Sequence, residues 1–279
     1  MNERFDNGIL TALRCPCCNS EMTLENDGKS LKCSAPKRHC FDFASSGYVN
    51  ISSSHGSGDS KEAVRSRTRF LDSGHYKPIS DAMRGILSRC VPQGGLIVDA
   101  GCGEGYYSCR VSGAGYSVCG FDLSKVAADQ AAKRARREGL SNTLFGVASV
   151  FELPMADSSA DAVMNIFAPC AEREYCRILK DGGILAVAYA GPEHLMGLKK
   201  KLYDRVYTNE ERSDMPKDMK LLEEIRVRYD ITLSGAEQIT DLFAMTPYYW
   251  RTSQSDKDKL LGLDSLTTEA DVIIAVYKK

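Results

Sequence analysis

The sequence predicts an α/β fold with a mostly parallel, seven-stranded sheet, preceded by a small cysteine-rich domain. From Gly95 onward, short apolar runs alternate with helical patterns, an order that is typical of βαβ units. Five of the 11 cysteines lie within the first 40 residues, so this part differs in composition from the rest. A chain of 279 residues is long enough for one large core and a small satellite.

The chain divides into three predicted parts, at residues 1–50, 51–93 and 94–279. The first is the cysteine-rich domain, the second is a polar linker with helices that cap the binding site, and the third is the α/β domain. Helices are expected at Lys61–Leu71 and Tyr76–Cys90, from Gly105, from Ser124 to about Glu138, and before Lys180. Strands are expected at Leu96–Val98, Tyr116–Phe121, Leu144–Ala148, Ala162–Phe167, Ile184–Tyr189, Glu224–Leu233 and Asp271–Tyr277.

The N-terminal cysteines have the spacing of a metal site. The pattern C-x2-C-x14-C-x5-H is formed by Cys15, Cys18, Cys33 and His39. Two residues between the first cysteines let both thiolates reach one ion, and a turn brings the second pair back to it. Three thiolates and one imidazole close the shell of a structural Zn²⁺. Cys40, next to His39, is an alternative fourth ligand that the spacing leaves open.

A glycine-rich loop is expected where the first strand of the α/β domain turns into a helix. Its pattern G-x-G-x-G consists of Gly101, Gly103 and Gly105. Tyr106 stands where a dinucleotide fingerprint needs its third glycine. Asp99, just before the loop, would repel a pyrophosphate but suits the ammonium and sulfonium of S-adenosylmethionine. Asp122 ends the second strand, where a carboxylate is placed to accept hydrogen bonds from ribose hydroxyls.

This constellation resembles the class I methyltransferase superfamily over roughly residues 70–279. The resemblance implies a Rossmann-like sheet and S-adenosylmethionine as the cofactor. Its methionine end would be lined by Asp99, Gly101, Gly103 and Gly105. Asp122 would hold the ribose, and Ala148 and Ser149 would lie beside the adenine. The segment Asn165–Pro169 would face the substrate and the methyl group.

The two domains together resemble one family, the 23S ribosomal RNA guanine-N1 methyltransferases. The matching motifs run in order along nearly the whole chain: Arg38–Asp42, Gly47–Asn50, Gly58–Ser60, Phe70–Tyr76, Asp99–Tyr107, Asp122–Ala127, Ala168–Cys170, Gly191–Leu195 and Met245–Pro247. The resemblance implies methylation of N1 of a guanine in a loop of 23S rRNA, with the zinc domain as the RNA-recognition end. It also implies that the zinc ligands are Cys15, Cys18, Cys33 and His39, and that Tyr76 and His194 contact the cofactor.

The reaction needs a group that accepts the N1 proton, because this proton blocks the lone pair at neutral pH. Asn165 and Glu104 are the candidates, but an amide is a poor base and Glu104 fits a cofactor contact equally well. The target base must be unpaired, and stacking on an aromatic ring is its usual support. The aromatic candidates are Phe167, Tyr248, Tyr249 and Trp250.

Basic side chains indicate where the RNA backbone could lie. Candidates for phosphate contacts are Arg14, Lys32, Lys37, Arg38, Arg65, Arg67 and Arg69. The run Lys133–Arg137 is instead expected to solvate the outside of a helix. The net charge of −1 gives no overall signature of a nucleic-acid-binding protein.

Two other interpretations stay open: a small-molecule methyltransferase whose zinc domain is purely structural, and a non-catalytic RNA-binding adaptor. The sequence has no apolar run of membrane-spanning length and no signal peptide pattern. We therefore expect a cytoplasmic protein without a membrane partner. Whether it forms a homodimer is left open.

Overall fold

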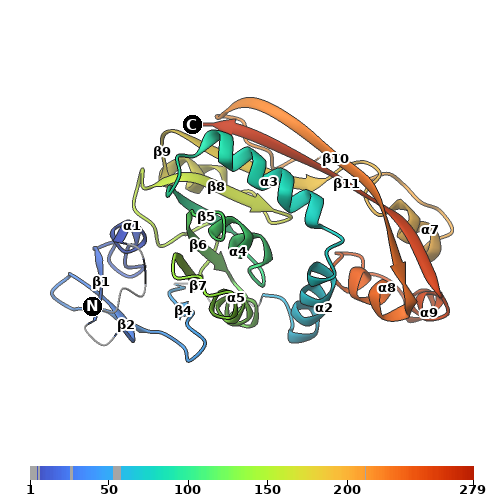
Figure 1. Cartoon of the computed structure of the whole chain (residues 1–279), viewed down its shortest axis with the longest axis horizontal. Coiled ribbons are helices and arrows are strands. Elements are labelled where there is room, and N and C mark those ends of the chain that lie inside the picture. Colours follow the sequence, from blue (N-terminus) through green and yellow to red (C-terminus); the bar gives the residue numbers. More distant parts are fainter. Residues whose placement is uncertain (1–4, 6, 26–27, 53–57, 211) are drawn as a thin grey trace.

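The computed structural model describes residues 5, 7–25, 28–52, 58–210 and 212–279. They form a three-stranded sheet near the N-terminus and a large eight-stranded sheet (Figure 1). The helices are α1 Asn7–Ala12, α2 Lys61–Asp72, α3 Lys77–Cys90, α4 Tyr106–Ser112, α5 Lys125–Arg137, α6 Glu172–Ile178, α7 Met196–Leu202, α8 Gly235–Ala244 and α9 Gln254–Leu261. The strands are β1 Met22–Leu24, β2 Ser30–Cys33, β3 Cys40–Asp42, β4 Val49–Asn50, β5 Leu96–Ala100, β6 Ser117–Asp122, β7 Thr143–Val147, β8 Ala160–Ile166, β9 Leu179–Ala190, β10 Lys220–Ser234 and β11 Ser265–Lys278. Within this described part of the chain, no helix is long and apolar enough to cross a membrane.

The large sheet has the strand order β10-β11-β9-β8-β5-β6-β7-β4. Strands β4 to β9 are parallel to one another, whereas β11 pairs antiparallel with both β9 and β10. All seven predicted strands are present, but the predicted strand count of seven is wrong, because β4 adds an eighth strand beside β7. Val49 pairs with Gly146 and Asn50 with Val147. A strand of two residues carries no periodicity that a sequence pattern could reveal.

The predicted elements differ from the observed ones mainly at their ends. The helix expected to reach Lys180 ends at Ile178, because β9 already begins at Leu179. The last two strands are longer than expected, since β10 and β11 pair with each other over most of their length. The short helices α1, α7, α8 and α9 lie in segments where the sequence pattern indicated no element.

Both faces of the large sheet are buried. Side chains alternate along a strand, so Ile97 of β5 packs on one face and Val98 on the other. Helices α2, α3, α4, α7 and α8 contribute to the first face, and α1 and α6 to the second. The first face includes Met83 of α3, and the second includes Tyr175 of α6.

The N-terminal domain shares the core of the second face. Ile9 of α1 and Leu31 of β2 belong to the same cluster as Phe121 of β6. The backbone N–H of Arg14 also donates to the carbonyl of Pro154 at 2.9 Å. The domain is therefore packed directly against the large sheet, at the end of the molecule opposite α7, α8 and α9 (Figure 1).

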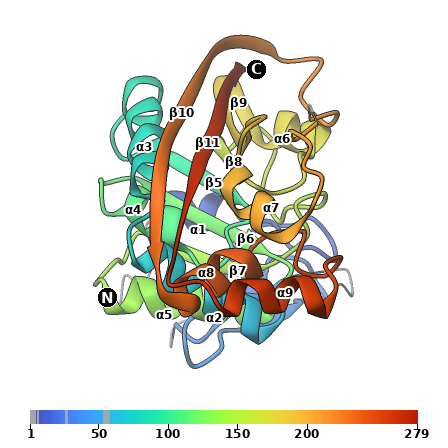
Figure 2. The same ribbon diagram turned by 90° about the vertical axis from the view of Figure 1, so that its right-hand side faces the viewer.

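The strands β10 and β11 form a long hairpin that carries α8 and α9 between them (Figure 2). Helix α8 packs against α2, and Arg69 Nε donates to the buried Asp241 carboxylate at 2.7 Å. Arg69 was a candidate for phosphate contact, but its guanidinium pairs with Asp241 instead. This contact fixes the C-terminal hairpin over α2, so residues far apart in the sequence enclose one space.

The prediction for Lys133–Arg137 is wrong at one position of α5. The helix begins at Ser124, whose hydroxyl accepts the N–H of Ala127 at 3.3 Å. One helical face from there points inward, and the Arg134 side chain on it is only 4% exposed. Its Nη2 donates to Glu104 Oε2 at 2.6 Å. Arg134 is thus buried because a buried carboxylate pairs with it.

Candidate active site and metal centre

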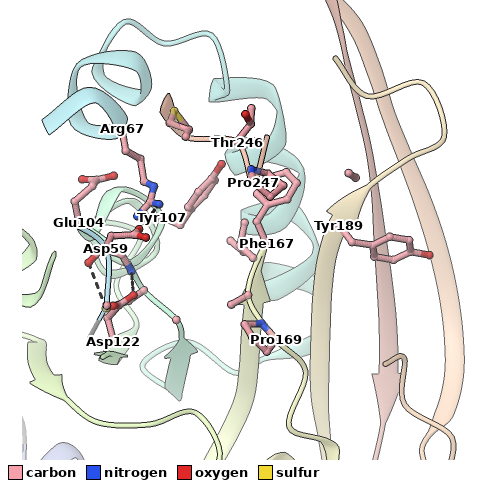
Figure 3. A pocket seen from close by; sticks show the side chains of 18 of the residues that line it. Asp59, Arg67, Glu104, Tyr107, Asp122, Phe167, Pro169, Tyr189, Thr246 and Pro247 are labelled. Atoms are coloured by element: carbon pink, nitrogen blue, oxygen red, sulfur yellow. Dashed lines mark hydrogen bonds and ion pairs between the residues drawn. The ribbon is translucent and has the colours of Figure 1, made fainter. Parts of the chain in front are cut away.

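A cavity of about 770 Å³ lies at the carboxyl ends of the parallel strands (Figure 3). This is where a doubly wound sheet binds ligands, because the loops after neighbouring strands diverge there. Asp99 comes from the end of β5 and Asp122 from the end of β6. The lining also includes the segment Ile166–Pro169 at the end of β8 and the segment Met245–Tyr248 after α8.

Most of the predicted cofactor residues meet in this cavity. Its lining includes Tyr76, Asp99, Gly101, Gly103, Glu104, Asp122 and His194. Gly105 and Ser149 are not part of the lining, although Val150 and Phe151, next to Ser149, are. The cavity thus joins residues from α2–α3, the glycine loop and the segment before α7.

The glycines of the loop have two different roles. Gly101 has φ +85°, and a Cβ there would lie 2.5 Å from the Ala168 Cβ, so a side chain would close the approach between the two loops. Gly105 has φ +82°, and its Cβ would lie 2.8 Å from the Ala131 Cβ of α5. Gly105 is therefore needed for helix packing behind the loop, which explains its place outside the lining.

Of the two acids at the strand ends, Asp99 is buried and Asp122 is partly buried, and both accept hydrogen bonds. Ser108 Oγ donates to Asp99 Oδ2 at 2.5 Å, and burial raises the pKa of Asp99 to about 7. The backbone N–H groups of Gly103 and Ser124 donate to the Asp122 carboxylate at 3.0 and 2.8 Å. Burial raises the pKa of Asp122 as well. Each carboxylate keeps lone pairs for a ligand, and ligand cations or hydroxyls would favour its ionised form.

Glu104 has its carboxylate already engaged. Arg134 donates to Glu104 Oε2 through Nε at 3.0 Å and through Nη2 at 2.6 Å. Burial raises the pKa of Glu104, and the charge of Arg134 opposes this shift. With only 1% of its side chain exposed, Glu104 is better placed to support the loop than to take a proton from a substrate.

A tyrosine–histidine pair stands at another wall of the cavity. The backbone N–H of Asp271 donates to His194 Nδ1 at 3.1 Å, and burial lowers the pKa of His194 to about 4. The neutral ring therefore carries its hydrogen on Nε2, which donates to Tyr76 Oη at 3.2 Å. Because Tyr76 Oη accepts this bond, its own hydrogen is available for donation to an acceptor on a bound ligand.

Asn165 lies behind the cavity. The side chain is fully buried, and its Nδ2 donates to Pro169 O at 2.9 Å and to Tyr175 Oη at 3.0 Å. These bonds hold the loop after β8 in place. Phe167 in that loop has φ +54°, a backbone conformation that residues other than glycine, asparagine and aspartate rarely adopt. Its ring is 44% exposed and enters the cavity near Pro247 (Figure 3).

Some of the other aromatic and basic candidates line the cavity, and others lie outside it. Tyr248 lines the cavity and donates to Asn209 Oδ1 at 2.9 Å, whereas Tyr249 and Trp250 are not part of the lining. Arg67 also lines the cavity, where its guanidinium forms an ion pair with Asp59 (Figure 3).

The cavity fits a polar cofactor with a positive charge. The Tyr107 hydroxyl is buried in the wall and has no hydrogen-bond partner among the described residues. An unpaired buried hydroxyl costs free energy, so a bound ligand that pairs with it would relieve that cost. Together with Asp99 and Asp122, the wall offers acceptors to an ammonium and to ribose hydroxyls, as S-adenosylmethionine requires.

The metal centre has the geometry that the spacing predicted. The ligand atoms of Cys15, Cys18, Cys33 and His39 all lie within 4.8 Å of one another. The Sγ atoms of Cys18 and Cys33 are 3.7 Å apart, and His39 Nδ1 is 3.5 Å from Cys33 Sγ. A zinc tetrahedron with Zn–S bonds of about 2.3 Å has edges of about 3.8 Å, so one Zn²⁺ fits. Cys40 is exposed and lies outside this group, so the cluster contains His39.

Several lining residues carry no signal that the sequence analysis could use. Asp59, Phe151, Arg212 and Asp214 all line the cavity. Asp59 belongs to a matching motif, but nothing in its local pattern assigns it a role. Arg212 and Asp214 lie in the long connection between α7 and β10, where no periodicity or motif marks them.

Comparisons with known proteins match both domains. Residues 93–238 match the family described as "Methyltransferase domain", and residues 13–52 match the family described as "RlmA, N-terminal", a zinc ribbon. A Bacillus subtilis protein, provisionally named a 23S rRNA (guanine-N1)-methyltransferase, is 30% identical over 94% of this chain and 96% of its own. A Micromonospora griseorubida protein with the same provisional name is 30% identical over 97% and 98%. The 23S rRNA (guanine(748)-N1)-methyltransferase of Streptomyces fradiae is 34% identical over 68% and 67%.

Proposed function

The chain belongs to the family of 23S rRNA (guanine-N1)-methyltransferases, and we propose that its cavity transfers methyl from S-adenosylmethionine to N1 of an unpaired guanine in 23S rRNA. The observation that carries this proposal is one cavity lined by the buried Asp99, the partly buried Asp122 and the exposed Phe167. The acids suit the cofactor, and the ring suits a flipped base. The cofactor supplies an electrophilic methyl group, and the protein orients the two reactants.

For the cofactor, Asp122 would accept hydrogen bonds from the ribose hydroxyls, and Asp99 would face the ammonium and sulfonium charges. Gly101 and Gly103 would let the backbone approach the methionine end. The Tyr76 hydroxyl, oriented by His194, would donate to an acceptor such as the methionine carboxylate. Glu104 and Gly105 would support the loop, with Ser149 beside the adenine.

For the RNA, we propose that residues 1–50 form a recognition module, 51–93 cap the cofactor and 94–279 hold it. The zinc ribbon keeps four basic side chains on its surface or partly exposed: Arg14, Lys32, Lys37 and Arg38. Phosphates are the natural partners of such groups. Ribosomal RNA as substrate also supports a cytoplasmic site of action, and a homodimer stays a prediction.

The test is transfer of radiolabelled methyl to ribosomes or naked 23S rRNA from a strain that lacks the gene. We expect one equivalent of label, and a reverse-transcription stop at one guanine, because N1 methylation blocks base pairing. Turnover of a small metabolite with no labelling of RNA would support a small-molecule methyltransferase. Calorimetry without binding of the cofactor or its demethylated product would support a non-catalytic adaptor.

The zinc ribbon has its own test. Cys15→Ser should release one equivalent of zinc and increase amide hydrogen exchange in residues 13–50. Cys17→Ser is the matched control, because Cys17 is exposed and lies outside the cluster. Native protein without zinc would contradict the metal assignment.

A further inference from the structure

The ion pair of Arg212 and Asp214 forms a rigid element in the wall of the cavity, and the proposed function does not use it. Arg212 donates through Nε to Asp214 Oδ1 and through Nη2 to Asp214 Oδ2 at 2.9 Å. A second anchor is the bond from Arg212 Nη2 to Ala168 O at 2.6 Å. Asp214 is held in turn by the backbone N–H of Cys170 at 2.9 Å. The guanidinium is therefore fixed on two sides, with 16% of its side chain exposed.

This pair lies beside the place where the methyl group is expected. Ala168, whose carbonyl accepts from Arg212, follows Phe167 directly. On its other side, the Ala168 Cβ is the atom that a Cβ at Gly101 would meet at 2.5 Å. Ala168 thus connects the cofactor loop, the exposed ring and the guanidinium. An acceptor base stacked on Phe167 would have Arg212 within reach of its edge.

Arg212 still has donors to offer. A guanidinium has five N–H groups, and Nε and Nη2 account for three of them. The two on Nη1 have no partner among the residues that the structure describes. Because this side chain is mostly buried in a cavity wall, an acceptor on a bound ligand would complete its hydrogen bonds.

Resting on the proposed function, we propose that Arg212 binds O6 of the acceptor guanine through Nη1, and that Asp214 is the residue that positions it. Guanine carries an acceptor at this position, whereas adenine carries an amino group that would meet the guanidinium donor to donor. The contact therefore selects guanine. It also leaves N1 free to face the methyl group.

The same contact assists the reaction. The N1–H bond breaks, its proton passes to a water molecule, and the electron pair spreads over N1, C6 and O6. Arg212 stabilises the charge that develops on O6, as an oxyanion hole does. N1 then forms a bond to the methyl carbon while the S–C bond breaks, and that pair stays on sulfur as a neutral thioether. Asp214 does not take the proton, since Arg212 lowers the pKa of its carboxyl to about 2.

The groups that face Arg212 allow a clean pH measurement. They are Asp214, Cys170, Tyr175 and Tyr189. Burial raises the pKa of Cys170 to about 11 and that of Tyr189 to about 12, and raises that of Tyr175 further. None of these side chains titrates between about pH 6 and 9 in the wild type. Asp99 titrates in this range, but Arg212 is not among the groups that shift its pKa, so its titration should be the same in all variants compared.

The experiment compares single-turnover methyl transfer to 23S rRNA by the wild type, Arg212→Met and Arg212→Lys. Arg205→Met is the matched control, since Arg205 is exposed in the same connection and outside the lining. Arg212→Met should slow transfer about 100- to 1,000-fold near pH 7, as loss of an oxyanion donor does. The cofactor Kd should change less than about twofold, and the rate should keep rising to higher pH than in the wild type. Lysine should restore part of the rate.

A substrate variant makes the test independent of folding. Inosine at the acceptor position lacks the 2-amino group but keeps O6, so the wild type should methylate it within about tenfold of guanosine. An Arg212→Met rate within about threefold of the wild type, on guanosine or on inosine, would overturn the assignment. Absence of guanine labelling by the wild type would overturn the proposed function and this inference with it. Normal labelling by both proteins would overturn the inference alone.

Discussion

The proposed cofactor side and the proposed acceptor side of the cavity are built in different ways. The cofactor side comes from one βαβ unit, in which Asp99, the glycines and Asp122 lie within 24 residues of sequence. The acceptor side is assembled from separate segments, among them Phe167, Arg212 and Met245–Tyr248. Local chain geometry fixes the first side, whereas tertiary packing alone fixes the second. A sequence motif can therefore identify the cofactor, whereas no such motif identifies the substrate.

The largest effect should come from the rigid base of the cofactor side. Arg134→Met leaves Glu104 as a buried carboxylate without its cation, which should cost about 3–5 kcal/mol of unfolding free energy in urea titration. Lys133→Met, in the same helix but with a side chain 52% exposed, should cost less than about 1 kcal/mol. Equal losses of unfolding free energy in both variants would mean that the buried ion pair of Arg134 and Glu104 contributes no more than a surface charge.

The next effect separates the two sides by ligand. Asp122→Asn should weaken cofactor binding about 10- to 100-fold, because it removes a charged acceptor in a buried site. RNA binding without cofactor should stay unchanged. Calorimetry for the cofactor and filter binding for RNA measure the two. Asp181→Asn is the control that should change neither, because the Asp181 side chain is fully exposed and lies outside the cavity lining. A loss of RNA affinity in Asp122→Asn would show that the cofactor side and the acceptor side do not bind their ligands independently.

A smaller effect is expected on the acceptor side, where a substitution should impair the reaction with RNA but not the binding of the cofactor. Phe167→Ala should lower kcat/KM for RNA about tenfold, because stacking of a base on an aromatic ring contributes about 1–3 kcal/mol. The cofactor Kd should stay within about twofold. Trp250→Ala is the control, since this ring is 72% exposed but lies outside the cavity. If Trp250→Ala has the larger effect, the base stacks elsewhere.

The smallest effect is a pH dependence of cofactor binding. With its pKa near 7, Asp99 is mostly protonated in the free protein at lower pH. A cofactor cation favours the ionised carboxylate, so binding releases a proton below pH 7 and affinity falls as pH falls. We expect about a tenfold loss from pH 8 to 6, measured by calorimetry in buffers of different ionisation enthalpy. Asp99→Asn should bind less tightly and without this slope; an unchanged slope would assign it to another group.

The parts of the fold that could be predicted from the sequence depend on residues that are close together in the chain. The strands, the glycine loop and the cysteine spacing each depend on residues close together in the chain, where periodicity and turn chemistry act. The pairing of Glu104 with Arg134 spans 30 residues, and the pairing of Arg69 with Asp241 spans 172. No local pattern distinguishes such buried charges from solvated ones, so Arg134 was expected in solvent. The strand β4 was missed for a related reason, since only the exposed edge of β7 makes Val49–Asn50 a strand.

The N-terminal domain and the large sheet share one apolar cluster, and this affects the order in which the two can fold during synthesis. During synthesis, residues 1–50 leave the ribosome before β7 and α6, which contribute to that cluster. At about 5–20 residues per second, the hundred residues between them take about 5–20 s to emerge. Throughout this interval Ile9 and Leu31 lack their partners on the sheet, while all four zinc ligands have already emerged. The metal can therefore hold the ribbon folded from the start, ready as a template on which the sheet edge later closes.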